Sequence, residues 1–352
     1  MSQKIVELHI DQLDTFYKVG ANVRERNNAF ELPWSETKDI DVFFNENSAP
    51  YKLFTVSNEQ GEGRIAAYQF EDKPESGYLG WYECDPDDDL ANELLSESKA
   101  WLISLGVTSI SGPMNGSSWG AFRFNTIAEK PLFATEPYQP LYYVKHWEKA
   151  GFNHDVIYET HIIPKEISRP MPYWKVRLLA FFIGVKFNKW PKNLIQNEAK
   201  LSDIHAFFHE CFGDNPLYRP VTFDRYKEIT VNLESILDFD HSYLVTDKKG
   251  KPVSVLISYK DVYHKMYLEG RLNDEVHNTH TLYMKTIATA KAWRGKHISR
   301  VLVNFGFVQA YKNGYSEVVF GTMMAENKSA QYSKSFFKAE AHRSYSFMKI
   351  EI

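Results

Sequence analysis

Residues 284–302 read MKTIATAKAWRGKHISRVL, and this stretch decides the fold. Its first half completes a predicted strand over 281–289 (TLYMKTIAT). A loop centred on Arg294-Gly295 follows, and the spacing of the apolar residues after it predicts a helix over 299–312. An Asn-Gly pair ends that helix, and the next strand is expected over 317–323. The order predicts a strand–helix–strand unit with parallel strands and a right-handed connection.

The first half of the chain repeats this order. A strand is expected over 77–84 (GYLGWYEC), a helix over 88–105 and a second strand over 108–114. Each half also opens with antiparallel strands and closes with a short helix and a strand. The opening strands are expected over 51–57, 64–70, 242–246 and 253–259, and the closing elements over 141–149, 156–163, 330–337 and 344–350. The sequence therefore predicts a duplicated α/β fold with mixed sheets.

The length of 352 residues also favours two domains of ordinary size. We expect an N-terminal lobe over 1–163, a helical linker over 164–197 and a C-terminal lobe over 198–352. The linker opens with three prolines and contains an apolar helix near 176–185. Its stretch 174–190 mixes aromatic residues with lysines and an arginine. A membrane-surface helix, one wall of an acyl groove, and an interdomain helix with snorkelling lysines all fit, and we favour the last.

The composition indicates a soluble protein. Hydrophobic residues make up 43% of the chain and charged residues 24%, which is ordinary for a globular domain. Cys84 and Cys211 have no metal or redox spacing, so we expect a cytoplasmic protein. The longest apolar run is too short for a membrane span, and a net charge of −4 disfavours nucleic-acid binding.

The stretch 284–302 resembles the central motif of the GNAT acyltransferase superfamily, in which the loop amides and the helix start hold the pyrophosphate of coenzyme A. A helix start suits that role because its first amides lack partners and carry the positive end of the dipole. The resemblance implies two GNAT-type lobes in tandem, with acetyl-CoA or another acyl-CoA bound in the second. Position by position it implies these cofactor-binding residues: Ile287, Thr289, Arg294, Gly295, Lys296, His297, Ile298, Ser299, Arg300 and, after the next strand, Asn327.

The chain departs from the family pattern at three positions. His297 and Ser299 stand where the motif prefers glycine or another very small residue, which lets the backbone approach phosphate closely. The tyrosine that serves the family as general acid would fall near Lys334, and the nearest tyrosine is Tyr332, which we take as the candidate acid.

The whole chain also resembles a bacterial subfamily of tandem GNAT-like proteins. The first half does so through GYLGWYEC (77–84), SISGPMNGSSW (109–119) and EPYQPLYYVKHWEKAGF (136–152). Its equivalent of the cofactor loop is the acidic run DPDDD over 85–89. Carboxylates cap a helix start well, but they repel a pyrophosphate. We therefore expect no coenzyme A site in the first lobe.

The remaining polar clusters give one further candidate. Glu269 follows a predicted strand and is our choice of general base, ahead of other acidic and histidine residues over 264–280. His264, His277 and His280 lack the pattern of a zinc site, so no metal is expected. Ser117 and Ser118 lack a nucleophile elbow, and turn duty fits them better.

These observations favour acyl transfer from acyl-CoA to the amine of a small molecule or peptide, by direct attack on the thioester and without an acyl-enzyme. Tyr138, Tyr142 and Tyr143 are expected to shape the acceptor site. Two alternatives stay open. One is a catalytically degenerate protein of the same fold that binds a small molecule or a protein partner. The other is a transferase that takes its acyl group from aminoacyl-tRNA, which the absence of a basic tract disfavours.

Overall fold

The computed structural model describes residues 4–27, 36–127, 133, 136, 139–167, 173–215, 217–261 and 280–352. Contacts divide the chain into two compact units. The first unit contains 1–129, 136–157 and 344–352, and the second contains 130–135 and 158–343. The lobes expected over 1–163 and 198–352, with a linker over 164–197, remain a prediction, because compactness does not show which segments fold as domains.

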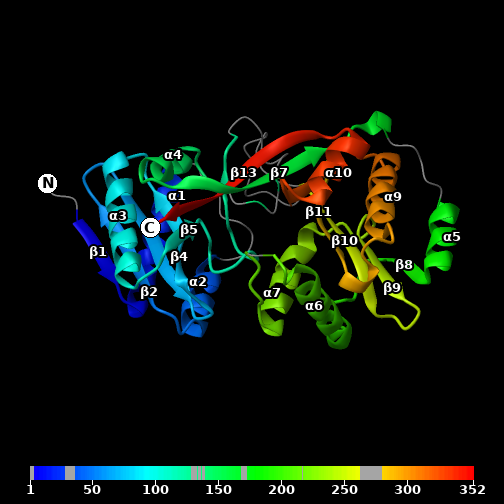
Figure 1. The fold of residues 1–352 in the computed structure, drawn as a ribbon, viewed down its shortest axis with the longest axis horizontal. Helices are drawn as coiled ribbons and strands as arrows, with labels where there is room; N and C mark the ends of the chain where they lie inside the picture. Colours follow the sequence, from blue (N-terminus) through cyan, green and yellow to red (C-terminus); the bar gives the residue numbers. More distant parts are fainter. Residues whose placement is uncertain are drawn as a thin grey trace. The chain divides into compact units, whose positions relative to one another are not determined.

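In the first unit, the strands are ordered β1-β2-β3-β4-β5-β13 (Figure 1). Its strands are β1 (Lys4–Leu8), β2 (Tyr51–Ser57), β3 (Glu62–Phe70), β4 (Lys73–Cys84), β5 (Ser109–Gly112), β6 (Phe124–Asn125) and most of β13 (Glu340–Glu351). Its helices are α1 (Leu13–Arg26), α2 (Glu36–Glu46), α3 (Asp88–Ser104) and α4 (Tyr142–Lys149), with a 3-10 turn over Ile10–Gln12.

In the second unit, the strands are ordered β7-β12-β11-β10-β9-β8. They are the later part of β7 (Asn153–Ile162), with β8 (Val185–Lys189), β9 (Tyr243–Asp247), β10 (Pro252–Lys260), β11 (Thr281–Thr289) and β12 (Glu317–Met324). The helices are α5 (Tyr173–Ile183), α6 (Glu198–Phe212), α7 (Phe223–Leu233), α9 (Ile298–Lys312) and α10 (Lys328–Phe337). 3-10 turns cover Lys165–Ile167, Glu234–Ile236 and Lys291–Trp293.

The predicted order of strand, helix and parallel strand is confirmed in both halves. β4 and β5 run parallel and are joined through α3, and β11 and β12 run parallel and are joined through α9. The predicted apolar face of α9 is buried in the core of the second unit: Val301, Phe305 and Val308 are all less than a tenth exposed. The expected stop is also present, with Asn313 as the C-cap residue and Gly314 at a positive φ of 96°.

The closing strands join a different sheet from the one that sequence order suggests. In β7, Tyr158, Glu159, His161 and Ile162 pair with β12, so the last strand of the first half completes the sheet of the second. β13 pairs with β5 through residues 348–351, so the last strand of the chain completes the sheet of the first half. In each compact unit, the strand next to the parallel pair therefore comes from the other half of the sequence.

Among the described residues, the structure contains no helix with the length and apolar character that crossing a bilayer requires.

Candidate functional site

The parallel strands of the second unit pair over only part of their length. β11 and β12 pair from Thr281–Glu317 to Met284–Phe320, and their ladder stops there. β11 continues to Thr289 against β10, whereas β12 continues against β7. Peptide groups alternate between the two sides of a strand. Beyond Met284, one edge of β11 therefore faces the space from which β12 has diverged.

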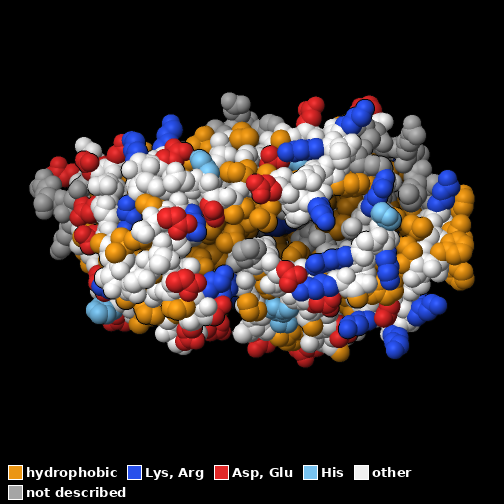
Figure 2. All heavy atoms as spheres, in the orientation of Figure 1, with side chains coloured by type: hydrophobic (Ala, Val, Ile, Leu, Met, Phe, Trp, Pro, Cys, Tyr) orange, Lys and Arg blue, Asp and Glu red, His pale blue; other side chains and the backbone are white. Residues whose placement is uncertain are grey.

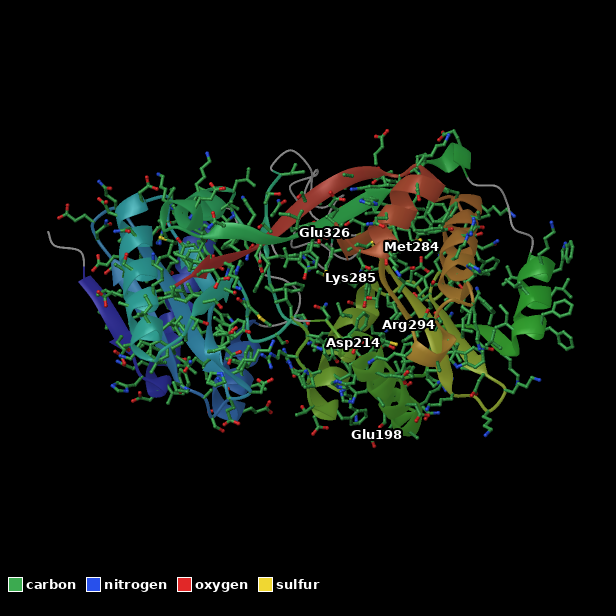
Figure 3. The ribbon with its side chains drawn as sticks, in the orientation of Figure 1. Glu198, Asp214, Met284, Lys285, Arg294 and Glu326 are labelled. Carbon is green, nitrogen blue, oxygen red and sulfur yellow. The ribbon has the colours of Figure 1, made fainter. Side chains whose placement is uncertain are left out.

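A β-bulge lies at the point of divergence. Ile257 and Ser258 are consecutive in β10, but they pair with Thr286 and Met284, so Lys285 is the extra residue of β11. A bulge bends its strand, and here it accompanies the turn of β11 away from β12. Figure 3 labels Met284 and Lys285 at this position, and Figure 2 shows a hollow on the same unit with Lys and Arg side chains around its rim.

The loop after β11 leads directly into α9. The amide of Ala290 donates to Val253, Lys291–Trp293 form a 3-10 turn, and Gly295 has a φ of 81°. α9 begins with no side-chain hydrogen bond to its first amides. Within the described part of the chain, no hydrogen bond is recorded from the amides of 295–299 to another backbone group. This helix start has the unpaired donors that an anion site requires.

His297 is the N-cap residue of α9 and lies in the left-handed region, with a φ of 60°. Side chains other than glycine rarely adopt that conformation, although histidine does so more readily than most. A glycine at this position would adopt the same φ without a Cβ penalty. The His297 side chain is exposed to solvent.

Arg294 braces the loop. Its side chain donates to the carbonyls of Cys211, at 3.0 Å, and Thr289, at 3.3 Å. Asp214 lies 3.9 Å from the guanidinium and accepts a hydrogen bond of 2.8 Å from Lys291 (Figure 3). The Lys291 ammonium holds the pKa of Asp214 below its usual value. Arg294 therefore fixes the loop against the end of α6, in addition to placing a positive charge there.

The other basic residues expected at the site lie over aromatic rings. The Lys296 ammonium lies 4.2 Å from the centre of the Trp293 ring, and the Arg300 guanidinium lies 5.4 Å from that of Tyr332. Burial raises the pKa of the Tyr332 hydroxyl, and the charge of Arg300 reverses only part of that rise. This rise moves the Tyr332 hydroxyl further from ionisation than an exposed tyrosine.

Asn327 is the N-cap residue of α10, but its side chain does not cap the helix and is exposed. Ile287 and Thr289 lie on the part of β11 that has left β12, with Ile287 paired to Leu256. Ile298 is buried as the first residue of α9, and Ser299 is exposed in its first turn. The structure thus brings the loop, the open strand edge and Tyr332 into one unit. Their contacts with a cofactor remain a prediction.

Sequence reasoning missed a charged cluster at the second turn of α10. Lys334 lies near the position at which the resemblance implies a tyrosine, and its ammonium lies 2.5 Å from the carboxylate of Glu159 on β7. His161 Nε2 lies 3.0 Å from the same carboxylate. Burial favours a raised pKa of Glu159, but the hydrogen bonds from Lys334 and His161 outweigh it and lower the pKa. The signal could not be read from sequence, because Glu159 reaches this unit only through the placement of β7.

Several candidates lie outside the described residues: Glu269, His264, Asp274, Glu275, His277 and Tyr138. The role of Glu269 as general base therefore remains a prediction. Among the residues that are described, no group of three or more His, Cys, Asp or Glu side chains has the arrangement of a metal site.

In the first unit, the amides at the start of α3 already have hydrogen-bond partners within the chain. The carboxylate of Asp87 accepts from the amides of Asp89, at 2.9 Å, and Leu90, at 3.2 Å, which confirms the predicted cap. The chain that follows β5 also lies close against β4: a Cβ placed on Gly80 would lie 2.0 Å from the carbonyl oxygen of Met114. Nearby, Ser117 Oγ accepts from the amide of Trp119, the turn duty expected of it.

Comparison with known proteins establishes the fold. No protein-family model and no curated protein sequence matches the chain, but many solved structures do. One is a conserved protein of unknown function from Enterococcus faecalis V583, described as a probable N-acyltransferase. Its TM-score is 0.51 at 8% identity, and the match covers all of this chain and 73% of that one. A tandem GNAT protein from the clavulanic acid biosynthesis pathway has a TM-score of 0.50 at 8% identity, over 99% and 98% of the two chains.

A third similar structure is the GCN5-related glucosamine N-acetyltransferase region of a fungal multi-domain GH3 β-N-acetylglucosaminidase. Its TM-score is 0.51 at 14% identity, over 99% of this chain and 38% of that one. These likenesses span the whole chain, and they confirm the predicted fold, a GNAT-type α/β fold present twice in tandem. Identities this low establish the fold and leave the reaction to be argued from the site.

Proposed function

We propose that this chain is an acyl-CoA-dependent N-acyltransferase whose acyl-CoA binds to the second unit. One observation carries the proposal: in that unit an uncapped helix start follows directly on a strand edge that has parted from its neighbour. A pyrophosphate at the amides of 295–299 would gain several hydrogen bonds and the favourable end of the α9 dipole. The amide-bearing arm of the cofactor would pair with the edge of β11 over 285–289, as an added strand would.

The chemistry proposed is direct attack of an amine of a small molecule or peptide on the thioester. The amine nitrogen bonds to the acyl carbon, the carbon–sulfur bond breaks, and the thiolate takes a proton. Tyr332 is the proposed proton donor, because a phenol carries its proton at neutral pH and the Arg300 guanidinium lies over its ring. Glu269 is the proposed base for the amine. Cys84 and Cys211 are both buried, and burial raises the pKa of each thiol, which fits a route without an acyl-enzyme.

A thermal-shift titration with free coenzyme A tests the proposal. A ligand that binds only the folded state at about 100 times its dissociation constant adds about 2.7 kcal/mol of stability. We expect His297→Asp to remove the shift, because it places a carboxylate beside the pyrophosphate, and to weaken affinity at least about tenfold. His297→Asn is the matched control, because asparagine is similar in size, neutral and equally tolerant of a positive φ. It should keep the shift.

The alternative function has its own outcome in this experiment. A degenerate protein that kept only the fold, binding a different small molecule or a protein partner, would show no shift with millimolar coenzyme A or acetyl-CoA. It is favoured by the lysine near the implied position of the family tyrosine, because the ammonium of Lys334 is committed to Glu159. If wild type and both His297 variants respond alike, the cofactor does not bind at this helix start.

A further inference from the structure

The α5 helix of the second unit has two apolar faces. Val176 and Ala180 point into the core, and Leu179 and Ile183 pack against it. The opposite face carries four large apolar side chains that are 48–78% exposed: Trp174, Leu178, Phe181 and Phe182. They follow the spacing i, i+4, i+7, i+8 and so form one stripe along the helix. A helix that is apolar all round needs cover on both sides, and the described residues cover only one.

The exposed stripe is bordered by lysines. Lys175 extends from α5 itself, with its ammonium 5.5 Å from the Trp174 ring. The turn between β9 and β10 carries Lys248, Lys249 and Lys251, all exposed. This turn is adjacent to the end of α5, because a Cβ on Gly184 would lie 3.8 Å from the Lys248 side chain. Figure 2 shows the result at the edge of the second unit, a band of hydrophobic side chains flanked by Lys and Arg.

Within the described turn over 247–251, one carboxylate stands among the lysines. Asp247 belongs to the same turn, and its carboxylate is occupied by the amides of Lys249 and Lys251. Lys186 is exposed on β8 and pairs in register with Thr246, beside the turn. The chain as a whole has a net charge of −4, so a positive rim around the stripe is a local feature.

We propose that this stripe and its lysine rim adsorb to the surface of an anionic lipid bilayer. Aromatic and aliphatic side chains on one face with lysines beside them match helices that lie at the boundary between headgroups and acyl chains. Lysines near a bilayer surface add attraction to anionic lipids. A helix of 11 residues is about 16 Å long, roughly half the apolar thickness of a bilayer, so α5 lies on the surface and does not cross it.

The charge distribution also argues against a second copy of this chain as the occupant. Two copies meeting through the stripe on a twofold axis would bring their lysine rims together, and like charges across an interface oppose association. An anionic surface meets the same rim with the opposite sign. The inference does not depend on the proposed acyl transfer.

Co-sedimentation of the full chain with vesicles tests the proposal. Phosphatidylcholine vesicles with about 30% phosphatidylglycerol should bind the protein at about 0.1 M salt, and pure phosphatidylcholine vesicles should bind it far less. The double variant Phe181→Ser/Phe182→Ser should reduce partitioning at least about tenfold. Lys248→Glu/Lys249→Glu should do the same and weaken the dependence on salt. Because all four side chains are exposed, these variants should keep the melting temperature of the wild type.

The matched control is Ile103→Ser/Leu105→Ser, which removes two apolar side chains of the first unit that are 45% and 38% exposed. It should bind anionic vesicles as the wild type does. The proposal is overturned if the wild type does not bind anionic vesicles, or if the control loses binding as the α5 variant does. It is also overturned if sedimentation velocity shows a dimer that Phe181→Ser/Phe182→Ser dissociates, while vesicles bind neither form.

Discussion

The two units carry the same strand–helix–strand element, but the starts of their helices differ. At α3 the carboxylate of Asp87 accepts from two of the first amides, so an anion belonging to the chain already occupies the positive end of the helix. At α9 the N-cap residue is His297, and its side chain makes no hydrogen bond to the helix start. The first amides of the helix thus donate to a capping carboxylate at α3 and have no side-chain acceptor at α9.

The strands before these helices differ in the same sense. Residues 285–289 of β11 pair with β10 but have left β12, whereas Gly80 of β4 lies against the backbone of Met114. In the first unit, Trp81 packs against Phe43, Phe44 and Tyr68 beside this contact. The strand–helix–strand element is therefore present twice, while the uncapped helix start and the parted strand edge are features of the second unit.

The largest expected effect is a loss of stability when a side chain is placed between β4 and Met114 in the first unit. In Gly80→Ala the new Cβ would meet backbone atoms of Met114 that cannot move aside, so we expect the first unit to lose about 3 kcal/mol of stability. Urea unfolding followed by circular dichroism measures the loss. Gly295→Ala is the control: no atom lies within 4 Å of its Cβ, and its φ of 81° should cost only about 1 kcal/mol. Equal losses in both variants would mean that Gly80 does not lie against the backbone of Met114.

The next largest effect is the loss of stability when the capping carboxylate of Asp87 is removed. Asp87→Ala leaves the amides of Asp89 and Leu90 without their acceptor and should lower stability by about 1 kcal/mol. His297→Ala removes no cap and should not lose stability in this way. Thermal melts of the two variants test the contrast. If both lose the same amount, the capping difference between α3 and α9 is not real.

A smaller gain in stability is expected from a substitution at the start of α9. His297→Gly removes a left-handed residue that carries a Cβ, and the relief outweighs the extra freedom of glycine in the unfolded chain by about 0.5 kcal/mol. Ser299→Gly, placed inside the first turn of α9, should instead lose about 1 kcal/mol. Chemical denaturation of the two variants measures both changes in the free energy of unfolding. A loss of stability in His297→Gly would contradict the claim that the left-handed conformation of His297 is strained.

The smallest effect concerns pH. Burial acts to raise the pKa of Asp87, but hydrogen bonds from Asn58 and the helix amides outweigh it and lower the pKa. A lowered folded-state pKa stabilises the protein above the unfolded value near 3.9, and this contribution is lost as the pH falls through the folded value. Between about pH 5 and pH 3, Asp87→Asn should therefore lose about 0.3 kcal/mol less than the wild type, a figure reduced for solvent screening. Melting temperatures across this range measure it, and parallel curves would contradict it.

Local pattern predicted much of this fold because the signals are local. The strand over 281–289 has the predicted bounds, α9 starts one residue before the predicted start, and the acidic run over 85–89 caps α3 as expected. Apolar spacing, an Asn-Gly stop and a capping carboxylate each act within a few residues, so they can be read without the rest of the chain.

What sequence could not reveal depends on contacts between distant segments. β7 and β13 are recognisable as strands, but nothing in their residues says that each joins the sheet of the other half. The pair formed by Lys334 and Glu159 follows from that exchange. The linker helix was expected to be an interdomain helix with snorkelling lysines, and its face with Phe181 and Phe182 is exposed. The sequence shows that a residue is apolar, but only the packing of the folded chain determines whether its side chain is buried or exposed.

Hydrogen–deuterium exchange of the full chain with and without coenzyme A tests the central claim most directly, since it reports both helix starts in one experiment. The open site at α9 predicts slower exchange of the amides over 295–299 and along β11 over 285–289, with no change over 87–90 at the start of α3. Protection at α3, or no protection at either helix start with saturating coenzyme A, would contradict it.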